Sequence, residues 1–318
     1  MKEIGGYFSL ELPANVDNMP NKNGILLNSC RNALELILRN IDTIKMLYIP
    51  YYTCNVVLEP IKKLNINYSF YSINENLEIA QEINLQNNEY IIYTNYFGIK
   101  DRYIKYLNNK YKDNLIIDNA QALFAEPTKK CAYSPRKYVG IADGGIAFID
   151  REIDLSSYEQ DISYERFNHL LIRRDTNASN GFAEFRTNDN KLVNNSIKTI
   201  SKLTKDIIDS IDFISVKEKR INNFMFLNNK LKHINRLTID DINNFECPLV
   251  YPFFTDDQNL KSKLIENKIY VATYWPNVFE WCKKDDFEYY LTNQLIALPI
   301  DQRYGINEMK KILEIIDL

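Results

Sequence analysis

Residues 115–121 read Leu-Ile-Ile-Asp-Asn-Ala-Gln, a short apolar run that ends in an acidic residue. Such a run is typical of a strand in a parallel sheet, because both faces of that strand are covered. The carboxyl ends of parallel strands meet at one edge of the sheet, where ligands bind. We therefore expect Asp118 at a ligand-binding edge, although an Asp that merely starts a turn would look the same in isolation.

The chain around this segment alternates strand-like runs with amphipathic helical stretches. Strands are predicted at 46–49, 68–71, 90–94, 115–118 and 146–149, and helices at 31–39, 54–63 and 101–111. This alternation predicts an α/β fold with a mainly parallel sheet and crossover helices.

The pattern changes after residue 155. Residues 156–191 are polar and irregular and are predicted to form a long loop. Beyond them we expect helices at 192–210, 214–232, 260–267 and 307–316, and strands at 249–253 and 269–273. The chain is thus divided into a large domain over 1–212 and a small C-terminal αβ domain over 213–318.

Composition excludes several classes of protein. The 318 residues are 45% hydrophobic and 25% charged, with a net charge of -3 that offers no basic field for nucleic acid. No apolar run approaches about 18 residues and no signal peptide is visible, so we expect a cytoplasmic protein without a membrane partner. The five scattered cysteines and two histidines predict neither a disulfide framework nor a metal site.

A lysine and a helix start complete the pattern that Asp118 begins. Lys137 stands between a Ser134-Pro turn and Gly144-Gly145, which lead into the strand at 146–149. A lysine there could face a pocket at the sheet edge, although most lysines are solvated surface charges. Residues 27–34 are a polar loop that runs into a helix, whose free N–H groups and dipole suit a phosphate.

Together these three segments match what pyridoxal phosphate (PLP) chemistry requires. A lysine amine forms a Schiff base with the cofactor aldehyde. A carboxylate beside the pyridine nitrogen keeps that nitrogen protonated, so that the ring can accept electrons. The chain order is a phosphate cradle, then the strand-end Asp118, then Lys137.

With these motifs the chain resembles the DegT/StrS family, PLP-dependent aminotransferases of fold type I that mostly act on nucleotide-linked keto sugars. The resemblance covers nearly the whole chain. It rests on Gly5-Gly6-Tyr7-Phe8, Pro50-Tyr51-Tyr52-Thr53, Asp118-Asn-Ala-Gln121, Lys137 with Gly144-Gly145, and the closing Leu-Pro turn within 297–304. It implies a mainly parallel large domain and a small C-terminal αβ domain.

The resemblance also implies roles for individual residues. Lys137 would be the Schiff-base lysine and then the base that moves a proton between substrate and cofactor carbons. Asp118 would pair with the pyridine nitrogen, and Gln121 would bond the ring hydroxyl. Ser29, Arg31 and Asn32 lie where the family holds the phosphate. A lysine at this position argues against the family's sugar dehydratases, which have a histidine there.

Three positions depart from the family pattern. Cys54 stands where an aromatic residue usually stacks on the ring, and Tyr52 or Tyr96 is a candidate replacement. Ala132 replaces a phosphate-binding serine, for which Ser134 is a candidate substitute. The partner-subunit Asn-x-Arg turn has its nearest counterpart in Glu184-Phe-Arg186. The candidate substrate residues are Tyr7, Tyr52, Tyr96 and Arg186.

The implied function is transfer of an amino group, from a donor such as glutamate, to a nucleotide-linked keto sugar in surface (lipo)polysaccharide biosynthesis. The implied assembly is a homodimer with sites at the interface. Two alternatives stay open: an aminotransferase for a non-nucleotide ketone, and a degenerate PLP-binding protein without transaminase activity. A protein that only binds a phosphorylated ligand would need no loop lysine.

Overall fold

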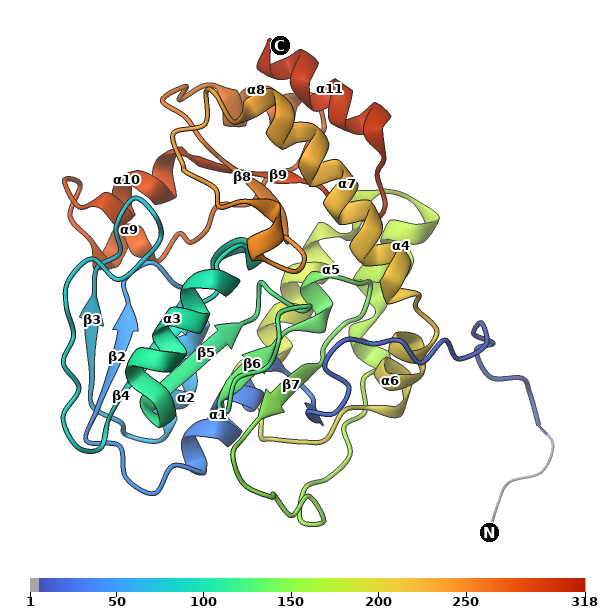
Figure 1. Ribbon diagram of the computed structural model, residues 1–318. Coiled ribbons are helices and arrows are strands. Elements are labelled where there is room, and N and C mark those ends of the chain that lie inside the picture. The colour runs from blue at the N-terminus through green and yellow to red at the C-terminus, as the bar shows by residue number, and fades with distance from the viewer. Residues whose placement is uncertain (1–5, 318) are drawn as a thin grey trace.

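A seven-stranded sheet forms the centre of the computed structural model, which describes residues 6–317 (Figure 1). Its strand order is β1-β7-β6-β5-β4-β2-β3. The strands are β1 (Ile25–Leu27), β2 (Met46–Pro50), β3 (Tyr68–Tyr71), β4 (Glu89–Thr94), β5 (Leu115–Asn119), β6 (Cys131–Tyr133) and β7 (Gly145–Phe148).

The sheet is mainly parallel. β3, β2, β4, β5 and β6 pair in parallel, and β7 is antiparallel to both of its neighbours, β6 and β1. In this register Asp118 of β5 lies opposite Thr94 of β4 and Ala132 of β6. The predicted α/β class is confirmed, and Asp118 lies at the carboxyl edge of the sheet.

Helices cover both faces of the sheet. Helices α1 (Cys30–Arg39) and α2 (Leu58–Lys63) pack on one face, where Ile116 is buried with them. Helix α3 (Asp101–Tyr111) packs on the other face with Leu115 and Ile117. Successive side chains of a strand point to opposite faces, so the continuous apolar run of β5 supplies both cores.

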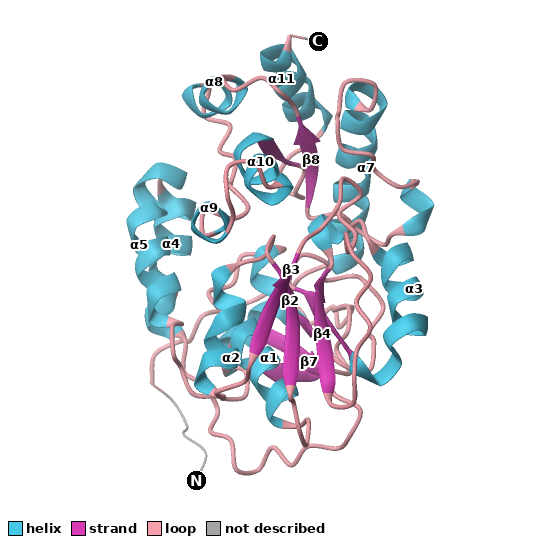
Figure 2. Ribbon diagram, turned by 90° about the vertical axis from the view of Figure 1, so that its left-hand side faces the viewer, coloured by secondary structure: helices cyan, strands magenta, loops and turns pink. Residues whose placement is uncertain are grey.

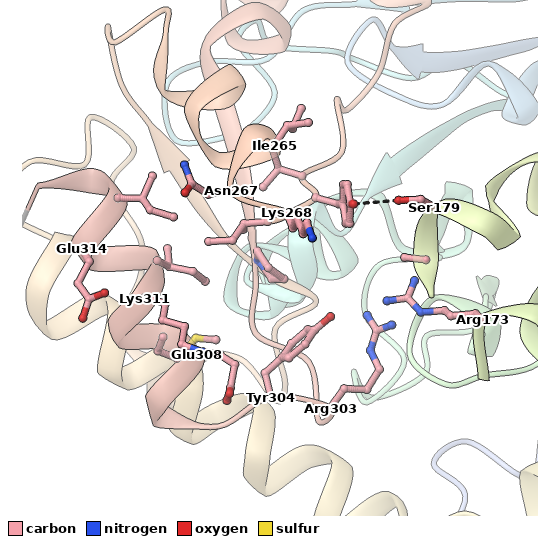
Figure 3. A pocket seen from close by; sticks show the side chains of 18 of the residues that line it. Arg173, Ser179, Ile265, Asn267, Lys268, Arg303, Tyr304, Glu308, Lys311 and Glu314 are labelled. Atoms are coloured by element: carbon pink, nitrogen blue, oxygen red, sulfur yellow. Dashed lines mark hydrogen bonds between the residues drawn. The ribbon is translucent and has the colours of Figure 1, made fainter. Parts of the chain in front are cut away.

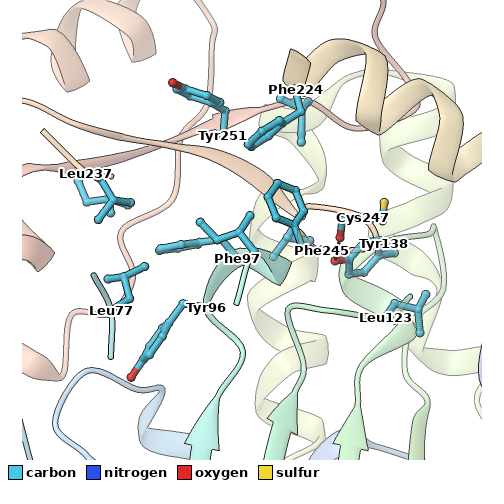
Figure 4. Close-up of a cluster of buried hydrophobic side chains, with 14 of the residues drawn as sticks. Leu77, Tyr96, Phe97, Leu123, Tyr138, Phe224, Leu237, Phe245, Cys247 and Tyr251 are labelled. Carbon is cyan, nitrogen blue, oxygen red and sulfur yellow. Dashed lines mark hydrogen bonds between the residues drawn. The ribbon is translucent and has the colours of Figure 1, made fainter. Parts of the chain in front are cut away.

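The C-terminal part forms a second, smaller layer above the sheet (Figure 2). Strands β8 (Val250–Phe254) and β9 (Leu295–Pro299) pair antiparallel. They lie among the helices α7 (Phe213–Leu231), α8 (Leu260–Glu266), α9 (Val278–Trp281), α10 (Phe287–Gln294) and α11 (Ile306–Ile316). One buried hydrophobic cluster includes residues of both parts, among them Tyr96, Tyr138 and Tyr251 (Figure 4). The division at residue 212 stays a prediction.

The predicted long loop at 156–191 is wrong. Much of it forms a helical hairpin of α4 (Asn168–Asp175) and α5 (Ala178–Lys191). Gly181 lets the helices approach closely, since a Cβ there would lie 2.9 Å from the His169 carbonyl oxygen. The hairpin has few apolar residues and several stay exposed, so its helical period was weak in the sequence.

Three other predicted elements differ. The helix expected at 192–210 shrinks to α6 (Lys202–Asp209), because Thr199 instead forms bridges with Leu27 and Gln160. The helix expected at 54–63 starts as a 3₁₀ turn over Asn55–Val57. No strand forms at 269–273. Within 6–317, no helix is both long and apolar enough for a membrane span.

Candidate active site

Asp118 occupies a buried position at the end of β5, with 8% of its surface exposed. Its Oδ1 accepts the Ala120 N–H at 2.9 Å. Burial raises the pKa of Asp118 above its usual value, and the positive charge of Lys137 together with this hydrogen bond offsets part of that rise. A positive charge or a shared proton next to Asp118 would therefore stabilise its buried carboxylate.

Lys137 closes a 3₁₀ turn over Pro135–Lys137 that follows β6. Its N–H donates to the Ser134 carbonyl at 3.2 Å, and Ser134 itself is buried. The charge of Lys137 also lowers the thiol pKa values of Cys30 and Cys54, although burial raises both overall. The charge of Lys137 thus acts on Asp118 and on both thiols.

Tyr138 anchors the lysine turn. Its hydroxyl donates to the Gln121 carbonyl at 2.7 Å and lies 3.2 Å from the Cys247 carbonyl (Figure 4). Its own carbonyl accepts from Arg220 and from Gln302 Nε2, the latter at 2.7 Å. Long-range contacts therefore hold the turn that carries the lysine.

The start of α1 lies against β7. Ser29 caps the helix by accepting the Asn32 N–H at 3.2 Å, which leaves the first N–H groups, those of Cys30 and Arg31, without a helical partner. A Cβ on Gly145 would lie 2.2 Å from the Ser29 carbonyl oxygen, so only glycine fits there. This contact places the helix start beside the strand that follows Lys137.

The residues that are predicted to bind the phosphate differ in the contacts that they already make. The Asn32 N–H is already bonded to Ser29, and the Asn32 side chain donates to Asn28 Oδ1 and the Ser196 carbonyl. The Arg31 guanidinium lies 3.3 Å from Glu59 and 3.7 Å from Asp189. Among the residues expected to hold a phosphate, Arg31 is the one whose backbone N–H has no helical partner at the helix start.

Gln121 has an unused buried donor. Its Oε1 accepts the Phe97 N–H at 2.8 Å, while its Nε2 has no partner among the described residues. A buried amide without a partner is destabilising, and a bound acceptor would relieve it. A ring hydroxyl next to Asp118 is such an acceptor, so the residues present fit the predicted cofactor.

Cys54 lies at a turn that the C-terminal part covers. Asn277 Nδ2 donates to the Thr53 carbonyl at 2.9 Å, and its Oδ1 accepts the Asn55 N–H at 3.2 Å. Tyr274 packs edge-on against Phe97 at 5.8 Å, and burial raises the pKa of Tyr274 to about 12. Sequence reasoning missed Tyr274 and Asn277, because no local signal links them to Cys54.

The candidate substrate residues separate into two groups. Tyr52 and Tyr96 are fully buried beside this site, and the Tyr96 hydroxyl donates to the Tyr52 carbonyl at 2.9 Å. Tyr7 is 99% exposed, and Arg186 lies on the exposed face of α5. Within one chain the structure therefore does not bring Tyr7 or Arg186 to Asp118 and Lys137.

Two segments named from the sequence differ from the expectation or lie outside the described residues. The turn expected at Glu184–Arg186 is wrong, since these residues lie inside α5. Gly5 of the opening Gly-Gly-Tyr-Phe segment lies outside the described residues. Cys30 is not among the predicted site residues, although it stands between Ser29 and Arg31, which are.

No family model and no curated protein matches this sequence. Solved structures do match. A DegT DnrJ EryC1 StrS aminotransferase from Brucella abortus is 14% identical with a TM-score of 0.58, covering 92% of this chain and 84% of that one. The PLP-form of the putative sugar aminotransferase Spr1654 from Streptococcus pneumoniae is 15% identical with a TM-score of 0.60, covering 91% and 85%.

A third similar structure is GDP-4-keto-6-deoxymannose-3-dehydratase (ColD) as its H188N mutant, 14% identical with a TM-score of 0.62, covering 91% and 87%. The fold of this chain is therefore that of the fold-type I PLP-dependent transferases. The solved structures that it is similar to include a DegT DnrJ EryC1 StrS aminotransferase and a putative sugar aminotransferase.

Proposed function

We propose that this chain is a PLP-dependent aminotransferase that acts on a nucleotide-linked keto sugar. The observation that carries the proposal is the set of the buried Asp118, the half-buried Lys137 and the buried, unpartnered Gln121 Nε2. These are a carboxylate, an amine and an amide donor at the carboxyl edge of one sheet. A plain structural cluster has no use for an unsatisfied buried amide.

Each side chain has a distinct task in this proposal. Lys137 would bind the cofactor aldehyde, Asp118 the ring nitrogen, and Gln121 the ring hydroxyl. Ser29, Arg31 and Ser134 would hold the phosphate. When bound, pyridoxal phosphate supplies an electron sink for the substrate carbon. The Lys137 amine, once free, holds and returns the proton at that carbon.

The raised pKa of Asp118 fits this task. A buried carboxylate is destabilised by desolvation, and a protonated ring nitrogen beside it would supply the missing positive charge. Tyr274 and Asn277, from the C-terminal part, partly cover the turn at Cys54. Desolvation strengthens the electrostatic contact on which the ring depends.

The choice of substrate is supported by similar structures. DesI was solved in the presence of its TDP-sugar product, and ColD with bound GDP-perosamine. For this chain, we propose the same kind of nucleotide-linked keto sugar, glutamate as donor, a role in surface polysaccharide synthesis, a homodimer and a cytoplasmic location. A non-nucleotide ketone is the alternative substrate, and Cys54 and Ala132 favour a degenerate PLP-binding protein as the alternative class.

A panel of nucleotide-linked keto sugars with glutamate, analysed by mass spectrometry, tests the proposal. We expect one amino sugar product, and a visible absorbance band from bound PLP. Lys137→Ala should abolish the product, the band and the borohydride-reducible link to PLP. The exposed Lys129→Ala is the matched control and should keep all three. A reducible link retained by Lys137→Ala would contradict the assignment.

A further inference from the structure

Helix α5 contacts the rest of the chain near both of its ends. Near its start, Ser179 Oγ lies 3.0 Å from the Tyr270 hydroxyl, in a pocket of about 900 Å³ between the α4–α5 hairpin and the C-terminal part (Figure 3). Near its end, the buried Asn188 donates to the Ala142 carbonyl at 2.8 Å. Ala142 lies between Lys137 and β7, so the end of α5 contacts the segment that follows the lysine.

Asp189, the next residue of α5, bridges two arginines. Its Oδ1 accepts a hydrogen bond from Arg136 at 2.5 Å and lies 3.7 Å from the Arg31 guanidinium. Arg136 directly precedes Lys137, and Arg31 lies in the first turn of α1. One carboxylate thus joins the turn that carries the lysine to the helix start that is proposed to hold the phosphate.

The bridge is part of a group of four charged side chains. Arg31 also lies 3.3 Å from Glu59, whose Oε1 accepts the Asn194 N–H at 2.8 Å. Two guanidinium groups thus face two carboxylates. The Arg31 side chain is 9% exposed, and that of Asp189 is 40% exposed. An isolated ion pair at the surface contributes little, but a network with a buried member can hold its parts in place.

The charge of Asp189 is unfavourable for α5 itself. The helix ends at Lys191, so Asp189 lies in its last turn, where the helix dipole disfavours a negative charge. The favourable contacts of this carboxylate are therefore those with Arg136 and Arg31. Removing the charge should leave the helix intact while it releases both arginines.

The cofactor site needs a fixed separation between its two halves. One PLP molecule would contact the Lys137 amine with its aldehyde and the start of α1 with its phosphate. Such a site must be held to within about 0.5 Å of its productive geometry. The carboxylate that joins Arg136 to Arg31 spans these two halves.

We infer that Asp189 is a positioning residue of the candidate active site. It sets the separation between Lys137 and the start of α1, and it acts through Arg136 and Arg31 rather than by contact with the cofactor. This inference rests on the proposed function for the identity of the cofactor. The tie between the two segments can be measured without PLP.

Hydrogen exchange of the full chain without PLP, followed by mass spectrometry, tests the tie. Asp189→Ala should speed amide exchange in residues 29–34 and 134–140 by about fivefold or more, because segments that lose a contact open more readily. Asp206→Ala is the matched control, since its carboxylate is 42% exposed and pairs with Lys202 within α6. It should change exchange in both segments by less than about twofold.

Absorbance titration with PLP tests the effect on the site. Asp189→Ala and Asp189→Asn should weaken PLP binding by about tenfold or more, because the amine and the phosphate site lose their alignment. Asp189→Glu keeps the charge and should recover most of the affinity. The melting temperature of PLP-free Asp189→Asn should stay within about 2 °C of the unaltered protein, because relief of the helix dipole offsets the lost ion pairs.

Three outcomes would overturn the inference. They are equal exchange in Asp189→Ala and Asp206→Ala, a PLP affinity of Asp189→Asn within about twofold of the unaltered protein, and PLP binding by Asp189→Glu that is as weak as that of Asp189→Ala. A lower melting temperature with unchanged PLP affinity would likewise show a purely structural role. An unaltered protein that does not bind PLP would instead contradict the proposed function, and exchange without PLP would still decide whether Asp189 ties the two segments.

Discussion

The guanidinium carbon of Arg220 lies 4.5 Å from the centre of the Tyr138 ring. Arg220 is 2% exposed, and its three hydrogen bonds go to neutral oxygens: Gln302 Oε1 at 3.0 Å, the Leu249 carbonyl at 2.9 Å and the Tyr138 carbonyl at 3.1 Å. One buried cation of α7 thus joins the C-terminal part to the turn that carries Lys137.

Replacing Arg220 should destabilise the protein strongly. Arg220→Met removes three charge-assisted hydrogen bonds and leaves buried acceptors unpaired, so we expect a loss of about 3 kcal/mol or more in the free energy of unfolding. Arg220→Lys should recover only part, because an ammonium cannot reproduce the fork geometry of a guanidinium. Urea unfolding measures both. A loss for Arg220→Met no larger than that of the exposed Arg174→Met would contradict this role.

Asp118→Asn should lower turnover without preventing PLP binding. We expect PLP still to bind while turnover falls by about 100-fold or more, because the ring loses its paired charge. Near-normal turnover in steady-state assays would show that Asp118 has no contact with the ring.

The same substitution should stabilise the protein without PLP. Burial raises the pKa of Asp118, so the folded state binds a proton at this carboxyl more tightly than the unfolded state does. The stabilisation that results from this proton is complete below about pH 3.8 and is lost as the pH rises through the raised pKa. At neutral pH the buried charge therefore opposes folding, and removing it should raise the melting temperature. A melting curve of the PLP-free variant that shows a lower temperature than the unaltered protein would contradict this sign.

Gly145→Ala should disturb the helix start that faces the site. The new Cβ would meet the Ser29 carbonyl oxygen at 2.2 Å, so β7 or α1 must shift, at a cost of about 1–3 kcal/mol. We also expect weaker PLP binding in a fluorescence titration. Gly140→Ala is the matched control in the same segment, since no atom lies within 4 Å of a Cβ there, and its effect should stay within about 0.5 kcal/mol. Equal effects of the two changes would refute the packing argument.

The α4–α5 hairpin should contact a partner subunit. Leu171 is 60% exposed, Phe182 58% and Phe185 44%, and exposed apolar side chains grouped on one element mark interaction sites. Leu171→Glu should weaken a homodimer by about tenfold or more in light scattering across a dilution series. A fully active species of 37.5 kDa would contradict a shared site.

Mixing inactive chains tests the shared site directly. Lys137→Ala and a chain altered at Arg186 should each be inactive alone. Activity in the mixture would place Arg186 in the partner's site, and no recovery would exclude that role.

The sequence by itself determined the class of fold and predicted two members of the candidate site. Apolar runs of strand length alternating with amphipathic stretches specify strands and helices locally, and chain order then specifies a parallel sheet. Asp118 follows directly from such a run, and Lys137 from its place between two turns. These signals are local in the chain, so they can be recognised without a structure.

The tertiary structure alone decided what surrounds Asp118 and Lys137. Tyr274 and Asn277 over Cys54, Arg220 against Tyr138, and the pocket beside α4 all join residues that are distant in the chain. Nor did the sequence reveal the α4–α5 hairpin, because its apolar residues are too few and too exposed to mark a helical face. Contacts across the fold depend on how elements pack, and packing leaves no periodic trace in either segment alone.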